Sequence, residues 1–330
     1  MTAVFARKIG IDLGTSTLQV YVRGEGVVAD EPCVAAVDPA SRRLRAIGRQ
    51  ALELAEQPGT TVQLVHPVAH GAFVDGGLVR GILVELVARV QGRHRLFRPE
   101  VMLCVPAGAP GDQRRALIAA AMTAGARQAW LIEAPLAAAL GLGLRVADSS
   151  PQGICDIGGG LVQVAVVSLS GIAASHVVPG GGEQLDSRLA ALLRESRGLD
   201  LDRPGAEALK IAIGAAVALD EPMSAEIRGT TVTSGELTHA VQDWLAAAVD
   251  AVRLVLDQTP RRLAAQVAER GFFLTGGGAL MPGIDRHLSR ETGIPFHVAG
   301  EPRTCAVRGT RRGLGEFEVV RRRQLYLGGR

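Results

Sequence analysis

The sequence is poor in aromatic residues, in lysine and in net charge. Aromatic types are 3% of its 330 residues while hydrophobic types are 47%, so a core must be built mainly from Val, Leu, Ala and Ile. The only lysines are Lys8 and Lys210, which together with abundant Ala and Gly indicates a genomic composition bias. A net charge of +3, without a basic run interleaved with aromatics, argues against a nucleic-acid partner.

Cysteine pairs and long apolar runs are also missing. Cys33, Cys104, Cys155 and Cys305 are scattered among apolar neighbours, which predicts buried free thiols in a reducing compartment rather than disulfides or a zinc site. The longest apolar stretch, residues 134–144, is much shorter than the roughly 20 residues that a membrane-spanning helix needs. The N-terminus lacks the apolar region of a signal peptide. We therefore expect a cytoplasmic protein that does not cross a membrane.

The same hairpin pattern occurs twice along the chain. Residues 8–22, KIGIDLGTSTLQVYV, and residues 153–167, GICDIGGGLVQVAVV, each read as an apolar strand, an aspartate, a glycine turn and a second strand. The two aspartates are Asp12 and Asp156. A repeat of this length indicates a duplicated domain, and two domains are expected for this chain length.

Strands alternate with helices in both halves, which predicts an α/β architecture with mixed sheets. In the first half the patterns predict a buried strand in residues 100–108, an amphipathic helix over 111–125, and a strand followed by a Pro-started helix over 129–143. In the second half they predict helices over 187–198 and 235–258, and a strand, a triple glycine and the start of a helix over 271–280.

These glycine turns suit a nucleotide. Glycine after a strand lets backbone N–H groups approach phosphate oxygens. Asp12 and Asp156, at equivalent strand ends, would place two carboxylates across a shared cleft, where they would hold a hydrated Mg²⁺ through its waters. The third turn, residues 276–278, is expected to open a helix whose N-terminus favours anions or a polar ligand edge.

Nearly the whole chain resembles the MreB family, the bacterial actin homologues. The resemblance lies in residues 9–38, 98–108, 124–143, 156–172, 270–285 and 291–310. It implies an actin-like fold (the actin/ribonuclease-H-like duplicated ATPase fold), with two domains around a nucleotide cleft and a small subdomain inserted in each. We expect domain I in residues 1–145, with its insert about 31–75. Domain II would span 146–330, with its insert about 183–265 and a C-terminal segment able to pack back on domain I.

The resemblance further implies ATP and Mg²⁺ as cofactors and assembly into homopolymeric filaments. These filaments would lie at the inner face of the cytoplasmic membrane, where they organise cell-wall synthesis proteins and cell shape. The implied nucleotide-binding residues are Asp12, Gly14, Thr15, Ser16, Thr17, Asp156, Gly158, Gly159, Gly160, Leu161, Gly182, Glu183, Glu207, Lys210, Gly276, Gly277, Gly278, Ala279 and Leu280.

The chain departs from the family pattern at several of its polar positions. Thr17 and Leu18 stand where the family has Asn and Thr, and Leu161 and Val162 replace two threonines. Glu183 stands at a usual Asp, and Ala212 replaces a glutamate that is a probable ribose contact. Backbone N–H groups still supply many of the hydrogen bonds to the phosphates, so we expect ATP binding to be retained.

The departure with the largest consequence is in LIEAP, residues 131–135. In the family two acids precede this proline and the second orients the attacking water, whereas here that position is Ala134. Glu133 remains, but on a helix its side chain would point about 100° away from that of residue 134. Gln163, on the same strand face as Leu161, is the remaining candidate for holding a water, although it could merely pair within the sheet. We expect little or no ATP turnover.

A short segment suggests a membrane contact. Residues 92–101, GRHRLFRPEV, place Leu96 and Phe97 among Arg93, Arg95 and Arg98, and the resemblance makes this loop a membrane-touching finger. Two apolar side chains would enter the interface while arginines meet anionic headgroups. The alternative is that Leu96 and Phe97 cap the core at the entrance of a strand.

Three alternative functions are weighed against the same sequence features. A degenerate scaffold that recruits wall-synthesis partners without nucleotide cycling would fit Leu18, Leu161 and Ala212. A small-molecule kinase of the same fold would need an acid where Ala134 stands, and a chaperone ATPase would need a large peptide-binding domain after the second half. Residues 221–237 are shorter than the family's usual run, which makes filament formation less certain than the fold.

Overall fold

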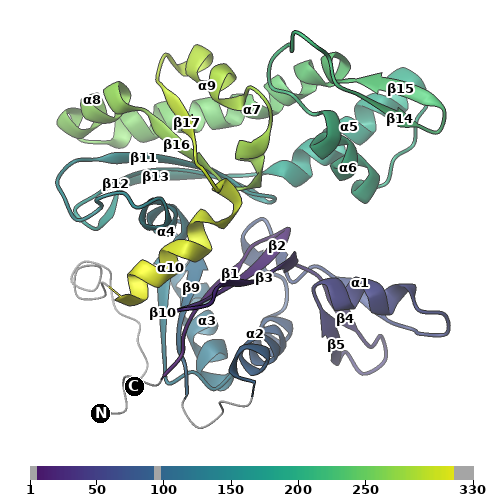
Figure 1. Cartoon of the computed structure of the whole chain (residues 1–330), viewed down its shortest axis with the longest axis vertical. Coiled ribbons are helices and arrows are strands. Elements are labelled where there is room, and N and C mark those ends of the chain that lie inside the picture. The colour runs from purple at the N-terminus through teal and green to yellow at the C-terminus, as the bar shows by residue number, and fades with distance from the viewer. Residues whose placement is uncertain (1–5, 93–97, 316–330) are drawn as a thin grey trace. The chain divides into compact units, whose positions relative to one another are not determined.

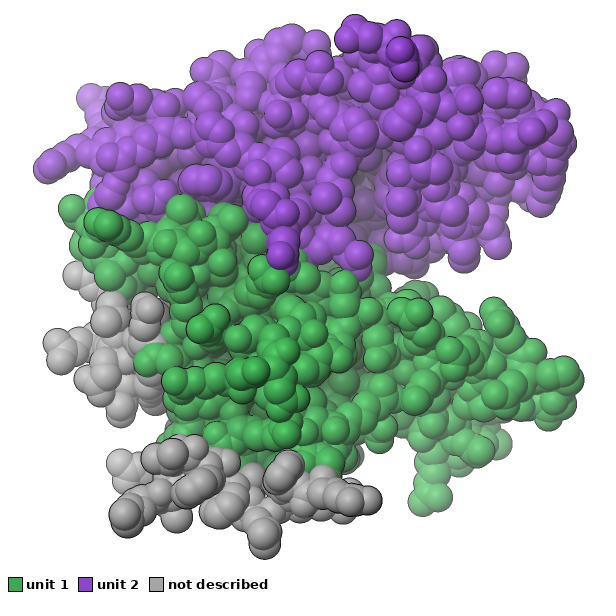
Figure 2. Space-filling model, viewed as in Figure 1, with its two compact units in different colours: residues 1–149, 169–171, 304–330 green, residues 150–168, 172–303 purple. Residues whose placement is uncertain are grey.

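The computed structural model describes residues 6–92 and 98–315, and these form two compact units (Figure 2). Unit 1 holds the chain up to Ser149, the short stretch Leu169–Gly171 and the residues from Thr304 onward. Unit 2 holds Ser150–Ser168 and Ile172–Arg303. Each unit is built on its own mixed sheet with helices, so the α/β prediction is confirmed.

The main sheet of unit 1 has the strand order β10-β9-β1-β2-β3 (Figure 1). β1 and β2 form an antiparallel hairpin, and β9 and β10 run parallel to β1. The parallel strands therefore end at one edge, which carries the first glycine turn. The strands are β1 (Lys8–Leu13), β2 (Thr17–Val22), β3 (Gly26–Pro32), β9 (Glu100–Val105) and β10 (Gln128–Glu133).

Helices pack on this sheet, and one pair of them is in unusually close contact. α10 lies against α4 and against β1, β2 and β9. A Cβ at Gly309 would overlap the Ala137 carbonyl, and one at Gly141 would overlap that of Cys305, so only glycine permits this approach. The helices are α2 (Gly76–Gln91), α3 (Gly111–Thr123), α4 (Ala134–Gly141) and α10 (Cys305–Gly315).

A smaller sheet of order β5-β4-β6 with helix α1, and the β7–β8 hairpin, complete unit 1. Their bounds are β4 (Ala35–Val37), β5 (Leu44–Ile47), α1 (Arg49–Glu56), β6 (Gln63–Val65), β7 (Val68–Ala69) and β8 (Ala72–Phe73).

The sheet of unit 2 repeats the plan of unit 1, with the order β13-β12-β11-β16-β17. β11 and β12 form an antiparallel hairpin, and β16 runs parallel to β11. Asp156 is paired with Gln163 in this hairpin, as Asp12 is paired with Gln19 in β1–β2. The strands are β11 (Gln152–Ile157), β12 (Leu161–Ser168), β13 (Gly171–Pro179), β16 (Phe272–Thr275) and β17 (Phe296–Val298).

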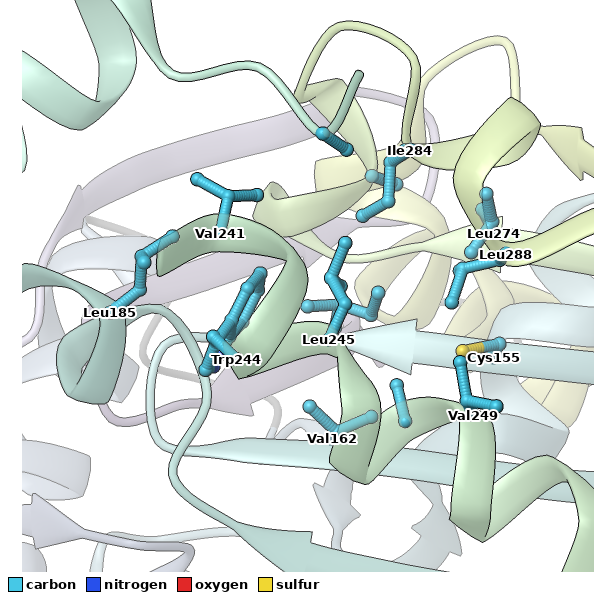
Figure 3. Close-up of a cluster of buried hydrophobic side chains, with 14 of the residues drawn as sticks. Cys155, Val162, Leu185, Val241, Trp244, Leu245, Val249, Leu274, Ile284 and Leu288 are labelled. Atoms are coloured by element: carbon cyan, nitrogen blue, oxygen red, sulfur yellow. The ribbon is translucent and has the colours of Figure 1, made fainter. Parts of the chain in front are cut away.

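The helices of unit 2 enclose an aliphatic core against this sheet (Figure 3). Trp244 and Leu245 of α7 lie in it together with Leu185 of α5 and Val162 of β12. The helices are α5 (Gly182–Arg197), α6 (Arg203–Ile213), α7 (Ser234–Gln258), α8 (Arg261–Arg270) and α9 (Ile284–Thr292), with a hairpin of β14 (Ser224–Ile227) and β15 (Thr230–Thr233) and the 3₁₀ turns η2 (Gly277–Leu280) and η3 (Pro302–Thr304).

The structure confirms most of the predicted elements and corrects the one that follows the third glycine turn. All four cysteines are free and buried, as expected. The helix expected after the third glycine turn is a 3₁₀ turn of 4 residues, because Met281 is extended and α9 begins only at Ile284. Within residues 6–92 and 98–315, no helix is both long and apolar enough to span a bilayer.

Candidate functional site

The second glycine turn has a fixed backbone. The Gly158 N–H donates to the Leu161 carbonyl at 2.9 Å, which closes the turn between β11 and β12. The equivalent bond in unit 1 joins the Gly14 N–H to the Thr17 carbonyl, also at 2.9 Å. The two halves therefore share the hydrogen bond that closes the turn, and not only its sequence pattern.

A second segment orients the carbonyls of this turn. We call residues 158–160 the glycine loop and residues 180–183 the supporting segment. All three carbonyl oxygens of the glycine loop accept N–H groups of the supporting segment, while the N–H groups of Gly159 and Gly160 bond to nothing in the described chain. The distances are 2.9 Å from Gly182 to Gly158, 2.8 Å from Glu183 to Gly159 and 2.9 Å from Gly180 to Gly160.

This arrangement makes the glycine loop suitable for an anion. The loop carbonyls are already bonded, and adjacent N–H groups without a bond in the described chain can bind phosphate oxygens. Gly181 permits the close approach, because a Cβ there would overlap the Gly158 oxygen and lie 2.7 Å from the Gly159 oxygen. The chemistry available at this point of unit 2 is therefore backbone donation to an anionic group.

Asp156 stands at the end of β11, beside the glycine loop. Its Oδ1 accepts the Thr275 hydroxyl at 2.9 Å, and its Oδ2 accepts the Gln163 amide at 3.2 Å. Burial raises the pKa of this carboxyl, and the hydrogen bonds from Thr275 and Gln163 oppose the rise. Gln163, which the sequence left between two roles, thus lies buried with its amide on Asp156.

In unit 1 the corresponding residues are arranged in a related way. Asp12 lies on β1 opposite Gln19, whose amide donates to Asp30 Oδ1 at 3.1 Å. Leu18 and Val162, which replace family threonines, lie in the cores of units 1 and 2. These substitutions therefore contribute apolar packing in this chain.

The expectation about Glu133 needs correction. It is not on a helix but is the last residue of β10, and Ala134 begins α4. Glu133 Oε1 accepts the Gly108 N–H at 3.0 Å and lies 3.6 Å from a guanidinium nitrogen of Arg114. Its carboxylate is therefore used to hold the loop after β9, while the Ala134 side chain offers no polar group.

The expected nucleoside residues of α6 are partly committed to other contacts. Lys210 Nζ lies 2.7 Å from Asp186 Oδ1 and donates to the Gly182 carbonyl at 3.3 Å. Glu183 forms an ion pair with Arg203. Glu207 lies on the same helix, half-buried.

The third glycine turn follows β16. Gly276 has a φ of 81° and donates its N–H to the Pro302 carbonyl at 2.9 Å. Ala279 is buried, whereas Leu280 is 57% exposed. Because η2 has only 4 residues, its helix dipole is weak, and the anion or polar ligand edge expected at this turn stays a prediction.

Three residues of unit 2 were missed by the sequence reasoning: Thr275, Asp186 and Trp244. Thr275 directly precedes the triple glycine, which is a signal that could have been used. Asp186 and Trp244 lie on apolar helix faces, and their partners come from other helices or loops. Leu96 and Phe97 lie outside the described residues.

Comparison with known proteins identifies the family. The sequence profile of the MreB/Mbl protein family matches residues 6–322. The chain belongs to the MreB/Mbl family. It is 37% identical over 321 residues to the cell shape-determining protein MreB of Escherichia coli K12, covering 93% of this chain and 92% of that one. It is 30% identical over 332 residues to the cell shape-determining protein Mbl of Bacillus subtilis 168, covering 98% and 100%.

Solved structures agree with this MreB/Mbl assignment. MreB5 of Spiroplasma citri bound to ADP superposes with a TM-score of 0.88 at 26% identity, covering 97% of this chain and 99% of that one. The same protein bound to AMPPNP gives 0.86 at 26% identity, covering 95% and 97%. A MamK double helical filament, at 18% identity and a TM-score of 0.80 over 94% and 99%, shares the fold. The actin-like fold expected from the sequence is confirmed.

Proposed function

We propose that this chain is an actin-like protein that binds an adenine nucleotide, assembles with copies of itself and helps to determine cell shape. The observation that carries the proposal is the glycine loop, whose carbonyls are bonded to the supporting segment while the N–H groups of Gly159 and Gly160 bond to nothing in the described chain. The MreB5 relative with the same fold was crystallised with ADP and with AMPPNP, which supports the choice of ligand.

The remaining residues take the following roles in this proposal. The hairpin of unit 1, residues 12–17, and the turns at Gly182 and residues 276–280 contribute further contacts to the nucleotide. Asp156 presents oxygens that each accept one hydrogen bond, so lone pairs remain for a second donor such as a metal-bound water. Asp156 would therefore be able to hold Mg²⁺ through its waters, and the ion would neutralise phosphate charge.

Hydrolysis is weak in this proposal. Ala134 has no group that could orient a water, and Glu133 is bonded to Gly108 and lies beside Arg114. The Gln163 amide already donates a hydrogen bond to Asp156, so it is not available solely to orient the attacking water. A water-positioning group contributes about 10²- to 10⁴-fold in rate, and its loss leaves binding with slow turnover.

The setting of the protein is the cytoplasmic face of the membrane, with Leu96 and Phe97 as the contact. The chain that follows this loop is bonded to the start of β1. The Glu100 N–H donates to the Arg7 carbonyl at 2.8 Å, and Lys8 Nζ donates to the Leu314 carbonyl at 2.8 Å. The N-terminal strand, the chain after the loop and the end of α10 thus meet at one edge of unit 1. Cell-wall synthesis proteins are the proposed partners. MamK, which has the same fold, forms a double helical filament, which supports the proposed self-association.

A second candidate is a scaffold that no longer binds nucleotide. The observation in its favour is that Leu18 and Val162 lie in the cores, so two family hydroxyls have been exchanged for apolar packing. In that case the glycine turns would be retained only for the fold.

Thermal unfolding with ADP and AMPPNP distinguishes the two. A ligand at 100 times its Kd stabilises the folded state by about 2.7 kcal/mol, which corresponds to a shift of about 4 °C in Tm for a chain of this length. We expect this shift with either nucleotide and Mg²⁺, together with slow phosphate release from ATP. Unchanged melting at millimolar nucleotide would favour the scaffold.

A further inference from the structure

The lysine that the sequence assigns to the nucleoside has a different partner in the structure. Asp186 on α5 is 1% exposed, and the Lys210 ammonium on α6 lies 2.7 Å from its Oδ1. The same ammonium donates to the Gly182 carbonyl at 3.3 Å. Lys210 therefore contacts α5 at two points. One is the buried carboxylate of Asp186, and the other is the carbonyl of Gly182, which belongs to the supporting segment.

The supporting segment is held at both of its ends. At one end the Trp244 indole N–H donates to the Gly180 carbonyl at 2.9 Å, from within the core of unit 2 (Figure 3). At the other end Lys210 holds the Gly182 carbonyl. Between these two points the segment donates its N–H groups to the three carbonyls of the glycine loop. The orientation of the loop thus depends on side chains that lie behind it.

We propose that the Asp186–Lys210 ion pair is a positioning element that sets the glycine loop for phosphate, whatever contact Lys210 makes to the nucleoside. This inference rests on the proposed nucleotide binding. The ion pair keeps the supporting segment in place, the segment turns the loop carbonyls away, and the N–H groups of Gly159 and Gly160 face the ligand. Breaking the pair would let these carbonyls rotate toward the phosphates and repel them.

The two roles of Lys210 predict different ligand dependence. A nucleoside contact would be lost only for ligands that carry a nucleoside, so inorganic triphosphate would bind equally well with or without Lys210. A positioning role affects every ligand that uses the glycine loop. Triphosphate and ATP would then lose affinity by the same factor, and a change at Asp186, which is buried, would reproduce the loss.

The experiment measures Kd for Mg-ATP and for Mg-triphosphate on the full chain and on five variants. Lys210→Met and Asp186→Asn each remove one charge, and the double variant removes both, which avoids an unpaired buried charge if a single variant folds poorly. Lys210→Arg keeps the charge. Arg197→Met is the matched control, since it breaks another ion pair of α5, with Glu236, away from the supporting segment.

We expect Lys210→Met, Asp186→Asn and the double variant to weaken ATP and triphosphate alike, by about 10-fold, as supporting residues behind a ligand commonly do. Lys210→Arg should recover most of the affinity, and Arg197→Met should change neither Kd. A loss confined to ATP, or full triphosphate affinity in Asp186→Asn, would overturn the inference while leaving the proposed function intact. No binding of either ligand by the unaltered chain would overturn both.

Local structure gives a second readout. The chain has 2 tryptophans, so Trp130→Phe leaves Trp244 as the sole emitter. In that background Lys210→Met should shift Trp244 emission to the red, because the Gly180 end of the supporting segment loosens. Unchanged emission together with lost affinity for both ligands would place the defect elsewhere and contradict the positioning role.

Discussion

Replacing Ala134 by glutamate should restore ATP turnover. Ala134 is the first residue of α4 and is 8% exposed, at the point where the family carries its water-orienting acid. A carboxylate there lies at a helix N-terminus, which stabilises an acidic side chain by about 0.3–1 kcal/mol. Glu133 would stay where it is, because its Oε1 already accepts the Gly108 N–H and lies beside Arg114.

The size of the effect follows from what a positioned group contributes. General acid–base groups contribute about 10²- to 10⁴-fold, which corresponds to about 2.7–5.4 kcal/mol of activation free energy. Since Leu161 also departs from the family, Ala134→Glu alone should give the lower part of this range, about 10²-fold. Adding Leu161→Thr should raise the rate further.

The assay is phosphate release at saturating Mg-ATP, with Kd measured alongside. Ala134→Gln is the matched control, because it has the same length and no carboxylate, and it should stay at the original rate. Two results would refute the reasoning. One is a folded, ATP-binding Ala134→Glu protein with unchanged turnover, and the other is an equal gain in Ala134→Gln.

Three further predictions concern pH, the supporting segment and the membrane. Burial, and then the charge of Arg290, lower the pKa of His287 in the folded chain. Below about pH 6.5 the unfolded chain therefore takes up a proton at His287 that the folded chain does not. The free energy of unfolding should fall as the pH drops below that value. Equilibrium urea unfolding between pH 5 and 8 should show this fall, and His287→Gln should reduce it. Gly181→Ala places a Cβ against the Gly158 oxygen and should displace the glycine loop. We therefore expect Mg-ATP binding to weaken by about 10-fold or more. An unchanged Kd in calorimetry would show that the glycine loop does not depend on this close approach. Leu96→Ser with Phe97→Ser should reduce co-sedimentation with anionic liposomes, and equal pelleting would exclude this contact.

The fold could be predicted in large part because its signals are local. Apolar runs that end in Asp and glycine predicted both the β1–β2 and the β11–β12 hairpin. The helical spacing of apolar residues over 235–258 predicted most of α7. The same local character explains two errors. Whether Glu133 ends a strand or begins a helix depends on its pairing with Val105 of β9, and whether residues 277–280 continue as a helix depends on the packing around Met281.

The candidate site was less accessible to sequence reasoning. The glycine turns themselves are visible in the sequence, whereas the contacts that orient them join residues far apart in the chain. Trp244 bonds to Gly180, and Thr275 bonds to Asp156. Lys210 shows the limit most clearly, since nothing in the sequence indicates its pairing with Asp186 on another helix, while its expected ligand contact stays a prediction.

The proposed function requires that this chain binds ATP although Ala134 carries no group to orient a water, and a calorimetric titration with Mg-ATP measures this binding. We expect a micromolar Kd for the unaltered chain, a clearly weaker signal for Asp156→Ala, and only slight heat from slow hydrolysis after saturation. Absence of binding heat in the unaltered chain, or an affinity indifferent to Asp156→Ala, would contradict it.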